Sequence, residues 1–192
     1  MKKFFIIILI LILTSTKSFS ESISDLEIEG FSIGQSLLKT FSKKKIINFF
    51  NYDDLPSSMK FRIAEIYNEK EINMDLYDAM QFYYKPEDSK FIIHGMNGFL
   101  FCKTSDFCET TFNQIFKDIK SSFSKNEFNE WNDVHPDDPS GESLVKGATF
   151  SISGGSLVIR YTDWSDKVEY TDNVGIEIST DEVSNWIRNN YY

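Results

Sequence analysis

Histidine and cysteine are scarce in this chain, with two of each among 192 residues. A zinc site built from Cys102, Cys108, His94 and His135 would need finger-type spacing, which these four residues lack. Basic residues are also few: 20 Lys and Arg stand against 29 Asp and Glu, and the lysines at 43–45 form the main basic cluster. Such an acidic chain repels phosphate backbones and anionic lipid, so we expect no nucleic-acid binding.

Internal repeats, low-complexity segments and interdomain linkers are absent as well. Aromatic residues are plentiful instead, with 18 Phe and nine Tyr, which indicates an ordered core rather than a disordered chain. The length suits one domain with a single sizeable core.

Long apolar runs are limited to Phe4–Leu13 (FFIIILILIL). This run has about half of the roughly 20 residues that a membrane-spanning helix needs. Lysines at positions 2 and 3 precede it, and small polar residues follow up to Ser20, the layout of an export signal cleaved before Glu21. An uncleaved signal is the alternative, because Lys17 lies close to the cut.

We therefore predict a signal peptide at 1–20 and a single domain at 21–192, soluble and either periplasmic or secreted, without a stable membrane anchor after cleavage. The mature chain would hold 17 basic and 29 acidic residues, a net charge of about −12. We expect no cofactor, and an envelope protein or a small ligand as the partner.

The hydrophobic pattern predicts the following elements: a strand at 23–29, helices near 33–41 and from 43, strands at 60–68, 75–85 and 91–101, a helix up to 123, a hairpin at 149–161, a strand at 174–179 and a last helix. Short turns between consecutive strands favour an antiparallel sheet with helices packed mainly on one face, an α+β fold.

The central helix is the most strongly predicted element. Its apolar residues recur at helical spacing along one stripe, at Cys108, Phe112, Ile115, Phe116, Ile119 and Phe123. Asp106, followed three residues later by Glu109, is a candidate cap for its first turn.

Cys102 and Cys108 flank the start of this helix with five residues between them. In an oxidising compartment this spacing favours a local disulfide. A redox pair would more typically be Cys-x-x-Cys with a lowered thiol pKa at the helix start, and two buried free thiols are the third interpretation.

Residues 30–34 (GFSIG) match the pattern G-x-S-x-G of a nucleophile elbow. Ser32, with His94 or His135 as the base, would make the protein a small serine hydrolase. That elbow belongs to parallel sheets, however, so we favour a capping box in which Ser32 and Gln35 begin a helix. Neither histidine has a sequence context that identifies a general base.

The loop at 133–138 offers possible cation ligands in Asp133, His135, Asp137 and Asp138. It departs from the calcium-loop template, because Asp138 stands at the glycine position and Leu144 at the position of the final glutamate. A cation-binding module is therefore a further hypothesis, beside an ordinary exposed loop.

Several segments together resemble a set of small exported proteins from AT-rich bacterial genomes: the apolar N-terminus, residues 28–38 (IEGFSIGQSLL), Tyr77-Asp78, the cysteine-bearing helix, and the end of the chain from Asp163-Trp164 to Trp186-Ile187. The resemblance implies a signal peptide followed by one α+β domain, and it assigns no activity. With no convincing catalytic set, we expect a non-catalytic binding or envelope-associated module rather than an enzyme.

Overall fold

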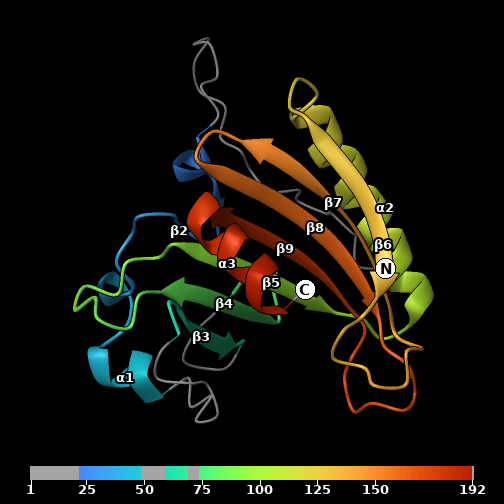
Figure 1. Ribbon diagram of the computed structural model, residues 1–192, viewed down its shortest axis with the longest axis horizontal. Coiled ribbons are helices and arrows are strands. Elements are labelled where there is room, and N and C mark those ends of the chain that lie inside the picture. Colours follow the sequence, from blue (N-terminus) through green and yellow to red (C-terminus); the bar gives the residue numbers. More distant parts are fainter. Residues whose placement is uncertain (1–21, 49–58, 69–73, 192) are drawn as a thin grey trace, which may run out of the picture.

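The computed structural model describes residues 22–48, 59–68 and 74–191, so the predicted signal peptide lies outside the described residues. Seven antiparallel strands form one sheet in the order β3-β4-β5-β9-β8-β7-β6 (Figure 1). The strands are β3 (Arg62–Tyr67), β4 (Ala79–Tyr84), β5 (Gly95–Phe101), β6 (Phe128–Val134), β7 (Leu144–Ile152), β8 (Gly155–Asp163) and β9 (Asn173–Thr180). The α-helices are α1 (Lys43–Asn48), α2 (Ser105–Ser122) and α3 (Asp181–Tyr191). The α+β prediction is confirmed.

Two meanders build the sheet, β3 to β5 and β6 to β9, and they meet where β5 pairs with β9. Helix α2 connects them, carrying the chain from the middle of the sheet to its far edge. Strand β6 is therefore an edge strand, with β7 as its neighbour in the sheet.

The two faces of the sheet differ in what covers them. Alternate residues of the central strands, such as Met96 and Ile176, form the main core together with the buried side of α2 and with Ile46 of α1. Helix α3 lies across the opposite face (Figure 1), where Val183 and Trp186 pack in a smaller cluster. The described helices thus pack mainly on one face, as predicted.

Helix α2 carries the expected stripe: Cys108, Phe112, Ile119 and Phe123 are buried, and the two residues between them at 115 and 116 are partly buried. Its cap is Thr104 rather than the predicted Asp106. The Thr104 hydroxyl accepts a hydrogen bond from the Phe107 N–H at 3.3 Å, which satisfies one of the free amides of the first turn.

The helix predicted near 33–41 is wrong, because only a short 3-10 turn forms there, η2 (Leu37–Lys39). Gly34 has a φ of +86°, outside the helical region. Its N–H donates to the Ile93 carbonyl at 2.9 Å, and the Leu37 N–H donates to the Phe91 carbonyl at 3.0 Å. Because part of the backbone bonds to this distant part of the chain, local hydrogen bonding is limited to the short turn at 37–41 and no longer helix forms.

The capping box predicted for Ser32 is wrong for the same reason. Ser32 ends β2 (Phe31–Ser32), which pairs with β1 (Glu27–Ile28) in a short hairpin. The two loop residues, Glu29 and Gly30, have φ values of 52° and 77°, as a type I′ turn requires.

Strand β6 is the element that the sequence pattern misses, since it predicts no strand between the helix ending at 123 and the hairpin beginning at 149. Its residues are exposed except for the half-buried Trp131. An edge strand with both faces largely in water needs no alternating apolar residues, so the pattern that marks buried strands is absent from it.

Candidate functional site

An open groove lies between α2 and strands β6 and β7. Its larger part has a volume of about 580 Å³, and its lining residues are Ser105, Asp106, Glu109, Asn132, Asp133, Val134, Leu144, Val145, Lys146, Tyr161 and Asp163. A smaller part of about 370 Å³ shares Asn132 and Lys146 with it, and adds Phe112, Asn113, Phe116, Glu130, Trp131 and Gly147. We call the two parts together the α2–β6 groove.

The groove follows from the path of the chain. Helix α2 packs on β8 and β9 near the middle of the sheet. The chain then returns along the far edge as β6, with β7 between the edge and the helix-covered strands. Because α2 packs mainly on β8 and β9, only some of its side chains, such as Phe116 and Lys120, reach the edge strand. The space over β7 around Lys146 stays open.

The groove is acidic. Five carboxylates line it, from Asp106, Glu109, Glu130, Asp133 and Asp163, against one cationic side chain. These groups give a local net charge of −4, within a chain of net charge −9. A cleft lined by charges of one sign concentrates the electric field and attracts ions of the opposite sign.

Lys146 is the cation at the centre of the groove. Its Nζ lies 2.7 Å from the Glu109 Oε1, and it sits over two aromatic rings, 5.5 Å from the centroid of Phe112 and 5.3 Å from that of Tyr161. The hydrogen bond from Lys146 lowers the pKa of Glu109 below its ordinary value. The groove thus holds an ammonium group between a carboxylate and aromatic faces, a favourable arrangement for a cation.

A second lysine at the rim has the same surroundings. Lys120 Nζ lies 5.2 Å from the ring centroid of Phe116 and 4.6 Å from that of Phe128. Its carboxylate partner is Glu130, at 3.4 Å. A lysine held by a carboxylate and two aromatic rings therefore occurs at two places along the groove.

The end of the groove near the start of α2 is built from hydroxyls and carboxylates. The Ser105 hydroxyl donates to Asp172 at 2.8 Å and lies 3.4 Å from a carboxylate oxygen of Asp163. Burial, helped by the charge of Asp163, raises the pKa of Tyr161 to about 12. Tyr161 therefore keeps its phenolic proton at neutral pH and can act as a hydrogen-bond donor.

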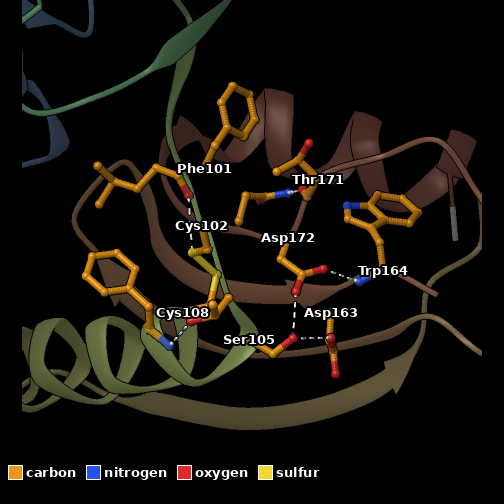
Figure 2. Close-up of a disulfide and its surroundings, with 12 residues drawn as sticks. Phe101, Cys102, Ser105, Cys108, Asp163, Trp164, Thr171 and Asp172 are labelled. Carbon is orange, nitrogen blue, oxygen red and sulfur yellow. Dashed lines mark hydrogen bonds between the residues drawn. A yellow bond between two sulfur atoms is a disulfide. The ribbon is translucent and has the colours of Figure 1, made fainter. Parts of the chain in front are cut away.

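A disulfide between Cys102 and Cys108 holds this end in place (Figure 2). Their Cα atoms are 5.5 Å apart, and both residues are buried. The bridge ties the end of β5 to the first turns of α2, and the Cys102 N–H donates to the Asp172 carbonyl at 2.8 Å. The favoured interpretation of the two cysteines is confirmed, and the bridge positions Ser105 at the mouth of the groove.

The three residues of the serine-hydrolase hypothesis lie in different surroundings. The Ser32 hydroxyl donates to the Gln35 Oε1 at 3.4 Å, and no hydrogen bond joins it to either histidine among the described residues. The His94 ring packs 5.6 Å from Phe61, and burial, followed by the charge of Lys85, lowers its pKa. The His135 ring lies 4.1 Å from that of Trp164, and its pKa is also lowered by burial.

The proposed cation loop uses its polar groups internally. Buried Asp138 accepts five hydrogen bonds, from the N–H and hydroxyl groups of Ser140 and Ser143 and from the Ser165 hydroxyl. The serine hydrogen bonds hold the pKa of Asp138 well below its usual range.

The other three candidate ligands do not converge on a common point. Asp133 accepts from the neighbouring Val134 N–H at 2.8 Å. The N–H of Asp137, in turn, donates to the His135 Nδ1 at 3.2 Å. In the described part of the chain, no three His, Cys, Asp or Glu side chains are grouped so that they could hold a metal ion.

Family models, curated proteins and solved structures were compared with the chain, and none matches it. Among the described residues, no helix is both long and apolar enough to cross a membrane.

Sequence reasoning missed the α2–β6 groove as a site. The predicted hairpin at 149–161 includes Tyr161 but not Lys146, which lies in the first half of β7, and the pattern predicts no strand where β6 forms the wall of the groove. The one local signal is a pair of acids near the start of α2, Asp106 in the first turn and Glu109 three residues later.

Proposed function

We propose that this protein is an exported, non-catalytic binding module whose α2–β6 groove holds an extended, cationic segment of a partner protein. The observation that carries the proposal is the position of Lys146, whose ammonium group lies against the Glu109 carboxylate and over the rings of Phe112 and Tyr161. The groove therefore already suits a lysine side chain. Among the described residues, Asp106, Asp133 and Asp163 have no lysine partner, so their carboxylates are available to a lysine or arginine of a partner.

The form of the groove supports a polypeptide over a compact ligand. Its two parts are joined end to end at Asn132 and Lys146, and they are open along their length. Such a groove suits a chain that places alternate side chains into it. The mixture of aromatic rings and carboxylates favours a segment in which basic and apolar residues alternate.

Export is part of the proposal and rests on the sequence of residues 1–20. The disulfide is consistent with it, because such bridges persist in oxidising compartments. We propose a periplasmic or secreted location, with an envelope protein that carries a basic segment as the partner.

A direct test measures the fluorescence anisotropy of a short labelled peptide in which lysine alternates with valine, and of the same peptide with glutamate in place of lysine. The proposal expects binding of the lysine peptide alone, weakening as salt is raised. Asp163→Asn and Asp106→Asn should each weaken binding by roughly 3-fold, a typical effect of one exposed charge. Glu87→Gln, which removes an exposed acid of the β4–β5 turn, is the matched control and should change nothing.

The direction in which a substitution of Lys146 changes the binding affinity distinguishes a cationic from an anionic ligand. Lys146→Met removes a positive charge and frees Glu109, so a cationic segment should bind several-fold more tightly, on the order of 3-fold or more. An anionic ligand would lose affinity in the same variant. Preference for the glutamate peptide, or equal binding of both peptides, would refute the proposed function.

A further inference from the structure

The outer edge of β6 is open. The Ser151 N–H donates to the Glu127 carbonyl, and the His135 N–H donates to the Ser143 carbonyl, at 2.8 and 2.9 Å. These two bonds place the backbone groups of the odd-numbered residues toward β7, because hydrogen-bonding direction alternates along a strand. The backbone groups of Phe128, Glu130, Asn132 and Val134 therefore point away from the sheet.

No strand of the described part of the chain pairs with this edge. Within the same described residues, the outward N–H groups of Phe128, Glu130 and Asn132 have no hydrogen-bond acceptor, whereas that of Val134 bonds to the Asp133 carboxylate. A seven-residue edge with free donors and acceptors is a template for another strand.

The sequence of β6 is complementary to itself when it is read in the opposite direction. The strand is FNEWNDV, with Trp131 at its centre. In an antiparallel pairing centred on that residue, Glu130 lies opposite Asn132 of the second copy, and Asn129 lies opposite Asp133 of the second copy. Phe128 and Val134 are opposed at the two ends. Every acid thus meets an amide that can donate to it, and each apolar residue meets another apolar residue.

We propose that two copies of this chain associate through β6, forming one continuous antiparallel sheet across a twofold axis at Trp131. The pairing is isologous, as expected for a closed dimer. In this register Glu130 and Asn132 exchange backbone hydrogen bonds with each other's copy through their outward groups. Trp131 lies opposite its own symmetry mate as a non-hydrogen-bonded pair, while its ring stays over β7, where Nε1 donates to the Thr149 hydroxyl at 3.0 Å.

Neighbouring registers are less favourable. Shifting the centre to Glu130 places that carboxylate opposite its own copy, a like-charge contact. Shifting it to Asn132 leaves Glu130 opposite Val134 and Asp133 opposite Trp131, so both acids lose their amide partners. The charge pattern selects the register centred on Trp131.

The dimer has a consequence for the groove. The twofold axis is perpendicular to the sheet, so both copies present α2 on the same face. The two α2–β6 grooves then lie next to each other along the joined edges. The pairing does not depend on the ligand proposed for the groove, since it uses the backbone edge and the side chains beside it.

The test is sedimentation velocity of the full chain, as processed by the producing cell, over a wide concentration range. A monomer–dimer equilibrium is expected. Asn129→Asp places Asp residues opposite Asp133 twice per dimer and should weaken association by about 10-fold. Adding Asp133→Asn to it restores one acid and one amide in each pair, and should recover association to within about 3-fold of the original.

Asn132→Pro provides a second, independent perturbation. Its N–H points outward, so the proline removes no bond to β7 and is tolerated at an edge, while it blocks the second strand and should abolish the dimer. Circular dichroism and the melting temperature at low concentration check that each variant stays folded. A chain that is monomeric at all concentrations, or a dimer unaffected by Asn129→Asp and Asn132→Pro, would overturn the proposal.

Discussion

Breaking the Cys102–Cys108 bridge is expected to lower the free energy of unfolding by about 2 kcal/mol, which is the chain-entropy contribution of a loop this short. The two cysteines are six positions apart, so the bridge removes only a small loop from the freedom of the unfolded chain. Replacing both residues with alanine should cost about 1 kcal/mol more, because buried sulfur atoms then leave their contacts in the main core.

Three samples separate the two contributions by urea denaturation: the oxidised protein, the same protein in reductant, and Cys102→Ala/Cys108→Ala. The loss from oxidised to reduced protein measures the cross-link, and the further loss in the alanine variant measures packing. The alanine variant should not respond to reductant, which makes it the internal control. Equal unfolding midpoints for the oxidised and reduced protein would refute the reasoning that the bridge stabilises α2 against β5.

Three further predictions concern the stability of the fold. Glu29→Gln should lower the free energy of unfolding, measured by urea denaturation, by about 1–2 kcal/mol, because the Glu29 carboxylate accepts the backbone N–H groups of 75–77 at 2.7–3.3 Å. The control is Glu27→Gln, at an exposed position that makes no such contact with the described residues; it should change stability by only a few tenths of a kcal/mol. The pKa of Asp138 is lowered in the folded state, so its carboxylate stabilises the fold above its ordinary pKa, and this stabilisation is lost as pH falls below that value. The difference in melting temperature between the protein and Asp138→Asn should therefore be large at neutral pH and small in acid. A difference that does not change with pH would contradict this. Gly147→Ala should destabilise by about 1–3 kcal/mol in the same denaturation assay, because the added Cβ would lie 2.5 Å from a backbone oxygen of β8 and 2.6 Å from the Trp131 ring; unchanged stability would show that the strand can shift.

Much of the fold could be predicted because the elements concerned are amphipathic. The stripe from Cys108 to Phe123 predicts α2 closely, and the alternation in β8 marks a strand whose two faces differ in burial. Both patterns are consequences of burying one side of an element. Where burial is asymmetric, a periodic sequence reports it directly.

The errors lie where burial is symmetric or where partners are distant. Strand β6 is exposed on both faces, so it carries no periodic signal. The segment after Ser32 has apolar residues at helical spacing, yet its backbone bonds to Phe91 and Ile93, more than fifty residues away. A local pattern contains no information about such partners.

The candidate site does not coincide with any of the sequence motifs. Ser32, His94 and His135 form a suggestive set in sequence, but they have separate neighbours in the structure. The groove combines Glu109 of α2 with residues of three different strands, and no spacing along the chain announces that combination.

The sequence by itself determined that the chain forms an antiparallel α+β domain, with a central amphipathic helix whose start is flanked by a cysteine pair. Hydrophobic periodicity and cysteine spacing are local properties, and local rules are sufficient to interpret them. Only the tertiary structure decided that α2 and the edge strand β6 flank an acidic groove with Lys146 at its centre, and that no strand of the described residues pairs with the outer edge of β6. Each of these depends on the order in which distant strands pair, which is set by the packing of the whole domain.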